Sequence, residues 1–206
     1  MARFVRWRIG ATLLAAAACA VSLAAARPAR AVLLQRSSTC SGSAERPFSR
    51  WGDLASYQLV PTGSFEGGAG GWTLSGGAKV VSGNETFYVH SRSDSRSLAL
   101  PAGAAATTPP FCVGLLRPTL RFFAVNGGST SSTLRVQVVF RGLLGVLGIL
   151  DGGTVSACSA WQPSPVMLAT LNAPLGTTSA QFVFRPADSA GAWRIDDVYV
   201  DPWLNR

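Results

Sequence analysis

Two adjacent carboxylates, Asp196 and Asp197, stand in the closing segment 193–201 of a chain that has only 10 acidic residues among 206. Paired carboxylates can act as acid and base on either side of one bond. The alternation and the β-branched composition of this segment predict a strand, however, and a strand sends successive side chains to opposite faces. We therefore expect Asp196 to share a face with Val198, Asp197 to share the other with Tyr199, and no acid/base pair. On an apolar face, Asp196 would need a partner, a hydrogen bond or a metal.

His90 is the only histidine, so it is the only imidazole base available to a serine nucleophile. No Gly-x-Ser-x-Gly motif accompanies it, and a lone histidine at a strand edge is more often a surface residue. The run Gly67–Gly71 lacks the Lys-Ser/Thr of a phosphate-binding loop. Cys158 has Ala157 and Ser159 as neighbours, and neither activates a thiol. The sequence therefore predicts a protein that is not an enzyme.

Flat aromatic side chains favour a binding function instead. Sugar rings have apolar C–H faces that stack on aromatic rings, while polar groups bind the hydroxyls at the ring edges. Most aromatic residues of a sandwich belong to its core, so the best candidates lie next to predicted loops. The ligand-binding candidates are Trp161 and Tyr88, which rank first on this ground, then Phe87, with His90 and Arg92 as polar partners.

The first 31 residues have the pattern of a secretory signal peptide. Three arginines precede an apolar run from Ile9 to Ala26, and Ala29-Arg30-Ala31 fits a cleavage site. The alternative is an uncleaved membrane anchor, because about 18 apolar residues can just span a bilayer. With cleavage after Ala31 we expect a protein of the extracellular space or the cell envelope that does not contact the membrane.

The net charge of +8 comes largely from residues 1–31, which carry five arginines and no acid. The remaining chain carries +3, and its basic residues are spread singly. Nucleic-acid-binding proteins present a clustered basic patch. Nucleic acid is therefore not an expected partner.

Three cysteines follow the signal segment, Cys40, Cys112 and Cys158. An exported protein can form disulfides, and three cysteines allow any one of three single bridges. We favour a Cys40–Cys112 bridge, which would restrict the unfolded chain by roughly 4 kcal/mol. It would also join the N-terminal segment to the body, and Cys158 would be a free thiol.

Short apolar runs separated by glycine and proline predict an all-β domain. Residues 32–60 are polar and irregular, which predicts an N-terminal arm with a short turn or strand over 51–59. A β-sandwich or jelly roll is expected at 61–206. Residues 134–141 alternate apolar and polar side chains most clearly. Further strands are expected at 62–66, 72–74, 78–81, 86–89, 97–100, 108–113, 120–125, 143–150, 166–171, 180–184 and 193–201, with a turn at 151–153.

Two motifs at opposite ends of this domain carry a family resemblance. Gly63-Ser64-Phe65-Glu66 followed by Gly71-Trp72 resembles the opening GxFE…GW motif of galactose-binding-like jelly rolls. Ile195-Asp196-Asp197-Val198 resembles the IDDV motif of their closing strand. Many carbohydrate-binding modules belong to this group, and the layout is also similar to that of small uncharacterised secreted bacterial proteins. The resemblance spans about residues 61–202 and implies a fold that hosts many functions.

The resemblance also implies a structural calcium ion where the first and last strands run close together. Carried over to this chain, it implicates Glu66 and Asp196 as ligands, with backbone carbonyls near Gly67. The alternative is that both carboxylates simply accept hydrogen bonds from backbone N–H groups or from Arg194.

We therefore expect a secreted, non-catalytic binding module whose partner is a polysaccharide or a cell-surface glycan. Two alternatives stay open. A structural or adhesive envelope protein that recognises another protein would carry a large exposed apolar patch. An atypical hydrolase would bring Glu66, Asp196 or His90 together in an open cleft. The sequence does not indicate an oligomeric state.

Overall fold

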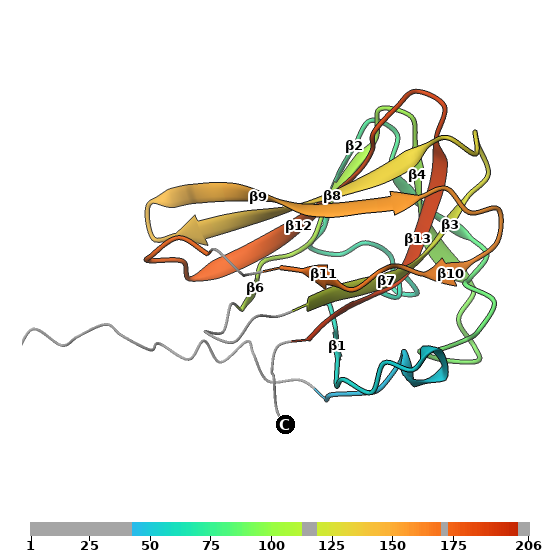
Figure 1. The fold of residues 1–206 in the computed structure, drawn as a ribbon, viewed down its shortest axis with the longest axis horizontal. Coiled ribbons are helices and arrows are strands. Elements are labelled where there is room, and N and C mark those ends of the chain that lie inside the picture. Colours follow the sequence, from blue (N-terminus) through green and yellow to red (C-terminus); the bar gives the residue numbers. More distant parts are fainter. Residues whose placement is uncertain (1–42, 113–118, 170–172, 202–206) are drawn as a thin grey trace, which may run out of the picture. The chain divides into compact units, whose positions relative to one another are not determined.

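The computed structural model describes residues 43–112, 119–169 and 173–201. Within these ranges every regular element is a β-strand except η2 (Ser49–Trp51), a short 3-10 helix. The strands form two antiparallel sheets, which confirms the expected all-β sandwich (Figure 1). None of the described residues belongs to a helix that is long and apolar enough to cross a membrane.

The closing strand β13 lies in the middle of a seven-stranded sheet. It pairs with β7 on one side and with β4 on the other, and β1 pairs with its end. The order along the sheet is β10-β7-β13-β4-β3, and β11 pairs with β7. The bounds are β1 (Gln58–Leu59), β3 (Lys79–Ser82), β4 (Arg96–Pro101), β7 (Thr119–Asn126), β10 (Gln162–Pro163), β11 (Met167–Leu168) and β13 (Ala192–Val200).

The second sheet has six strands and is dominated by a long hairpin. The hairpin strands β8 and β9 are joined by Leu143 and Leu144, and β12 pairs with the other side of β8 (Figure 1). The order is β2-β5-β12-β8-β9, and β6 pairs with β12. The bounds are β2 (Thr73–Ser75), β5 (Ala105–Thr107), β6 (Phe111–Cys112), β8 (Thr133–Gly142), β9 (Gly145–Ser156) and β12 (Ser179–Pro186).

The main core lies between the sheets and follows the period-two pattern of the strands. In β8 the apolar residues at even positions are buried, while Arg135 and Arg141 on the other face are exposed. Because alternate strand residues share a face, each strand supplies one apolar row to the core. The largest buried side chains of this core are Phe65, Phe122, Phe140, Phe182, Phe184 and Trp193.

A second apolar cluster covers the opposite face of the seven-stranded sheet. This outer cluster consists of Phe48, Tyr57, Phe123 and Tyr199, all buried. Phe48 stacks on Phe123 at 5.4 Å between ring centroids and meets Tyr57 edge-on at 5.0 Å. The turn and strand expected over 51–59 are present as η2 and β1, which lie on the side of β7 and β13 away from β8 (Figure 1).

Most expected strands are confirmed, but three local predictions are wrong. Residues 62–66 form turns, because Thr62 and Phe65 have positive φ angles of 57° and 59°. Residues 86–89 form a turn in which Tyr88 has a φ of 53°. Residues 151–153 continue β9, since an irregularity in the β8–β9 register accommodates Gly152 without ending the strand.

Candidate functional site

The predicted placement of Asp196 and Val198 on one face is wrong, because β13 contains a bulge. Asp196 pairs with Phe123 and Tyr199 pairs with Arg121, so two residues of β13 stand opposite one residue of β7. Asp197 has a φ of 46°, the left-handed conformation found at such bulges.

The bulge changes which side chains face the core. Ile195 and Val198 both lie in the main core although their sequence separation is odd, and Tyr199 joins the outer cluster. Asp196 therefore does not share a face with Val198. Both aspartates are fully buried, and they lie near the loop that connects β3 to β4.

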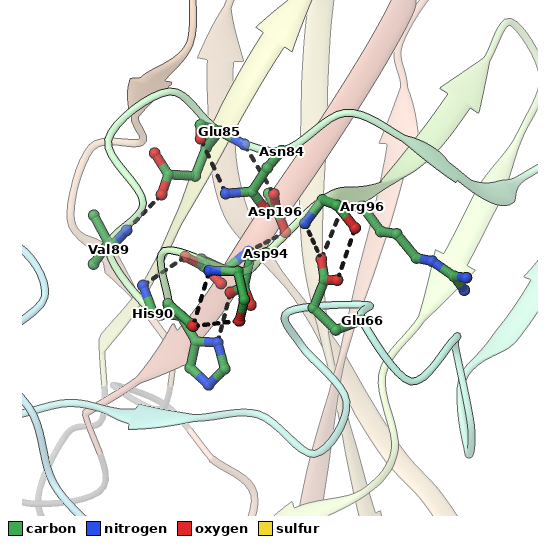
Figure 2. Close-up of polar contacts among 12 residues, drawn as sticks. Glu66, Asn84, Glu85, Val89, His90, Asp94, Arg96 and Asp196 are labelled. Atoms are coloured by element: carbon green, nitrogen blue, oxygen red, sulfur yellow. Dashed lines mark hydrogen bonds and ion pairs between the residues drawn. The ribbon is translucent and has the colours of Figure 1, made fainter.

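The connecting loop 83–95 folds onto these two carboxylates (Figure 2). The backbone N–H of Glu85 donates to Asp196 Oδ2 at 3.1 Å, and that of His90 donates to Asp197 Oδ2 at 3.2 Å. Glu85 is itself buried, and its carboxylate accepts hydrogen bonds from the backbone N–H groups of Phe87 and Val89. These bonds shape the turn that replaces the expected strand at 86–89.

Three buried acidic side chains lie close together under this loop, and each has a raised pKa. Burial, together with the charge of Asp197, raises the pKa of Asp196 to about 9. Burial and the charge of Glu85 raise the pKa of Asp197 to about 7, while His90 opposes the shift. Burial also raises the pKa of Glu85, against its backbone hydrogen bonds. Of these three acids, none forms an ion pair with an arginine or lysine among the described residues.

Glu66 is bonded to the end of the same loop rather than to Asp196. Its Oε1 accepts hydrogen bonds from the backbone N–H groups of Ser95 at 2.8 Å and Arg96 at 2.7 Å, and its Oε2 accepts one from the Ser95 hydroxyl (Figure 2). Asp196 likewise accepts backbone hydrogen bonds on both oxygens.

The predicted calcium ligands thus have their hydrogen bonding satisfied by protein donors, which does not match the free oxygens that calcium requires. Among the described residues, the buried side-chain oxygens without a hydrogen-bond partner belong instead to Asn84, Asp197 and Tyr199. Calcium binding at Glu66 and Asp196 stays a prediction.

The sugar-binding candidates Phe87 and Trp161 both pack against the outer cluster and are partly buried. Phe87 meets Trp51 edge-on at 4.9 Å between ring centroids. The guanidinium of Arg194 lies 5.6 Å from the centroid of the Trp161 ring. Tyr88 follows Phe87 on loop 83–95 and is 49% exposed. We call the three rings that pack against the outer cluster, Trp51, Phe87 and Trp161, together with the exposed neighbour of Phe87, Tyr88, the aromatic face.

Trp51 is the member of this face that the sequence reasoning missed. It stands in the polar arm, yet it packs on the outer cluster and on Phe123 at 5.4 Å between ring centroids. The signal was present in the sequence: Phe48, Trp51 and Tyr57 are closely spaced aromatic residues in an otherwise polar segment.

The two predicted polar partners differ in their surroundings. Arg92 is exposed. His90 Nδ1 lies 2.7 Å from Asp94 Oδ2. Asp94 is buried, and it was not among the residues selected from the sequence. Burial lowers the pKa of His90, but the hydrogen bond to Asp94 acts in the other direction and the net shift is upward.

A pocket of about 350 Å³ is lined by Ala160 and Gln162, the two sequence neighbours of Trp161. Its other lining residues include Thr130, Cys158 and Ser159. The Cys158 thiol is unpaired, and burial raises its pKa. Cys40 lies outside the described residues, so the predicted Cys40–Cys112 bridge is not tested.

A scan against protein-family models finds no family that matches this chain, and a search of curated proteins finds no match. Solved structures share its fold. The enzymatically active domain of tailspike protein 4 from bacteriophage CBA120 is 22% identical with a TM-score of 0.51, and the match covers 69% of this chain and 21% of that chain. An arabinose-bound GH51 α-L-arabinofuranosidase is 16% identical with a TM-score of 0.51, over 72% of this chain and 27% of that chain.

The CBM22-1 xylan-binding domain from Paenibacillus barcinonensis Xyn10C is 17% identical with a TM-score of 0.48, over 67% of this chain and 90% of that chain. This chain thus spans only 21% of the tailspike chain and 27% of the arabinofuranosidase chain. At these identities the likeness shows the fold alone. The predicted jelly-roll β-sandwich is confirmed, and a function has to be argued from the surface of this chain.

Proposed function

We propose that this protein is a secreted, non-catalytic module that binds polysaccharide through the aromatic face. The observation that carries the proposal is that Trp51, Phe87 and Trp161 are all partly exposed on one buried aromatic cluster. Segments distant in sequence, the arm, loop 83–95 and the turn before β10, supply these three rings. Their convergence places several flat apolar surfaces on one side of the sandwich, as sugar stacking requires.

Packing gives these rings fixed positions, which lowers the entropic cost of binding. Trp51 and Phe87 each lie within 6 Å of the Arg50 guanidinium, at 5.6 Å and 5.5 Å from the ring centroids. Arg194 holds Trp161 in a similar way. The guanidinium N–H groups are donors that suit sugar hydroxyls at the edge of a stacked ring.

The pocket lined by the sequence neighbours of Trp161 offers neutral polar groups. Thr130, Ser159 and Gln162 line it and offer hydroxyl and amide groups. Such groups bind neutral sugars without requiring an ionised ligand. We therefore assign the principal stacking position to Trp161 and a second one to Tyr88.

We assign no catalytic role to Glu66 and Asp196. A hydrolase needs two acids that reach one bond from an open cleft. Asp196 is fully buried, and Glu66 binds the backbone of Ser95 and Arg96. A fully buried Asp196 does not suit the open cleft expected of an atypical hydrolase.

Retention on insoluble polysaccharides tests the proposal, with xylan, galactan and cellulose as probes and a glycan array for soluble ligands. We expect the unmodified protein to be retained and Trp161→Ala to lose most of this retention. Ile149→Ala is the control, since it removes an apolar side chain that is 63% exposed on the other sheet. Failure of the unmodified protein to bind any polysaccharide or array sugar would refute the proposal.

A second candidate function is recognition of another protein, and the tip of the β8–β9 hairpin favours it. Leu143, Leu144, Val146 and Ile149 are 53–101% exposed, and Leu175 is 99% exposed. Monomeric soluble proteins rarely expose such a group of apolar side chains without a use for it. This is the surface expected of an adhesive or structural envelope protein. Loss of a bound partner in Leu144→Glu, with polysaccharide retention absent in the unmodified protein, would favour it.

A further inference from the structure

Three potential metal ligands lie close together where loop 83–95 meets the bulge of β13. The ligand atoms of His90, Asp94 and Asp197 all lie within 4.8 Å of one another. Loop 83–95 supplies His90 and Asp94, and the bulge of β13 supplies Asp197. We call these three residues the His–Asp–Asp cluster.

Among the described residues, no arginine or lysine forms an ion pair with the carboxylates of this cluster. Asp94 is 7% exposed and Asp197 is fully buried. Glu85 and Asp196 are also buried. The charge of Glu85 raises the pKa of Asp197, and the charge of Asp197 raises the pKa of Asp196. Among the described residues, the only ion pair made by these four acids is the contact of Asp94 with His90.

Two buried polar atoms in this region point to a ligand. Asp197 Oδ1 is buried without a hydrogen-bond partner, and so is the hydroxyl of Tyr199, two residues further along β13. Tyr199 is fully buried and lies within electrostatic range of Asp197 and Asp94. Buried polar atoms are almost always satisfied by protein, water or an ion. A left-handed backbone at Asp197 is a strained conformation of the kind that clusters at ligand sites.

We propose that His90, Asp94 and Asp197 bind a divalent transition-metal ion of the zinc class. Zinc accepts imidazole nitrogen and carboxylate oxygen at about 2.0–2.2 Å, and sites with three protein ligands keep a fourth position for water. Calcium takes oxygen ligands alone, so the imidazole distinguishes the two metals. The ion replaces the proton shared by His90 Nδ1 and Asp94 Oδ2, which are now 2.7 Å apart.

The ion would link loop 83–95 to the closing strand next to Phe87 and Tyr88. It would therefore fix the part of the aromatic face that this loop supplies. That consequence rests on the proposed polysaccharide binding, but the metal site itself does not, and metal binding is measured without any sugar.

Thermal melting and calorimetry of the chelator-treated protein test the site, with zinc chloride alone as the first probe and calcium chloride alone as the second. We expect one zinc ion per chain and a rise of the melting midpoint with zinc. His90→Ala and Asp94→Asn should weaken zinc binding by about 10-fold or more. Cys158→Ser is the control for capture by the unpaired thiol and should bind zinc as the unmodified protein does.

His90 also gives a readout that needs no variant, because it is the only histidine of the chain. A long-range ¹H–¹⁵N spectrum of the unmodified protein shows one imidazole, whose Nδ1 resonance should move on addition of zinc. An unmoved resonance, or zinc binding lost in Cys158→Ser, would overturn the proposal. A midpoint that rises with calcium alone and no longer does so in Glu66→Gln would place the ion at Glu66 and Asp196 instead.

Discussion

The backbone N–H of Glu85 donates a hydrogen bond to Asp196 Oδ2 at 3.1 Å, which joins residues 111 positions apart. The bond ties the start of loop 83–95 to the centre of the seven-stranded sheet. The same loop carries Phe87 and Tyr88, two of the four residues of the aromatic face. The carboxylate of Asp196 therefore holds a candidate binding loop rather than a reaction centre.

Removal of this carboxylate should destabilise the protein. In Asp196→Ala the buried N–H groups of Glu85 and Asp197 lose their acceptor, which should lower the free energy of unfolding by about 1–3 kcal/mol. Asp196→Asn keeps one acceptor oxygen and should lose less. Urea denaturation measures both variants. Equal stability of Asp196→Ala and the unmodified protein would show that the bond does not hold the loop.

Arg121 fastens the arm to the outer face of the sheet. Its Nη1 donates to Asp53 Oδ2 at 2.8 Å, its guanidinium lies 4.3 Å from the centroid of the Phe48 ring, and its other N–H groups donate to the Ser164 carbonyl. Burial raises the pKa of Asp53, but hydrogen bonds from Tyr57 and Arg121 prevail and hold it below its ordinary value of 3.8.

This lowered pKa predicts a loss of stability in acid. Because the unfolded state binds the proton more readily, the ion pair stabilises the fold fully well above pH 3.8. The contribution disappears as the pH falls through the lower pKa of the folded state. Asp53→Asn should be less stable than the unmodified protein at pH 7, and the difference should shrink below pH 3.8. A difference that is independent of pH would contradict this assignment.

Gly83 is predicted to control the position of Arg194 on Trp161. Gly83 has a φ of 101°, and a Cβ there would lie 2.6 Å from Arg194 Nη2. Gly103 is the matched control, because it has a φ of 77° and an added Cβ would meet nothing within 4 Å. Alanine at either site should cost about 1–2 kcal/mol for the left-handed backbone.

Only Gly83→Ala should displace the guanidinium from the indole. Tryptophan fluorescence and polysaccharide retention should therefore change in Gly83→Ala and stay constant in Gly103→Ala. The same change in both variants would mean that Arg194 does not determine the environment of Trp161.

A substitution at the tip of the β8–β9 hairpin should change association without changing stability. Leu144 is fully exposed, so Leu144→Glu should change the free energy of unfolding by no more than about 0.5 kcal/mol. The charge should abolish any association through the apolar tip, which size-exclusion chromatography of the purified protein measures. A large loss of stability would instead show that the tip packs against another part of the chain.

The sandwich was predictable because its strands expose a period-two pattern. The alternation in β8 and the aromatic and β-branched closing strand identify the two sheets without any long-range information. The strands predicted at 62–66 and 86–89 do not form, because Phe65 and Tyr88 adopt left-handed backbone conformations that composition does not reveal.

The arrangement around Asp196 and Asp197 could not be predicted from the sequence, for a related reason. A bulge inserts one residue into β13, and this single insertion moves Ile195 and Val198 onto the same face. Period-two reasoning assumes an unbroken register, so it placed Asp196 on the face of Val198. Loop 83–95 supplied four of the five predicted ligand-binding residues together, whereas Trp51 was missed because the arm that carries it reads as polar and irregular.

The central claim, that the aromatic face binds polysaccharide, is tested most directly by a binding isotherm on insoluble polysaccharide for the unmodified protein, Trp161→Ala and Ile149→Ala. If the substitutions leave the fold unchanged, the melting midpoints of all three proteins should agree within a few degrees. The same samples serve for this control. The account predicts saturable binding by the unmodified protein and Ile149→Ala, and an affinity at least about 10-fold lower for Trp161→Ala, as loss of one stacked ring implies. Equal binding by Trp161→Ala and Ile149→Ala, or no binding by the unmodified protein, would contradict it.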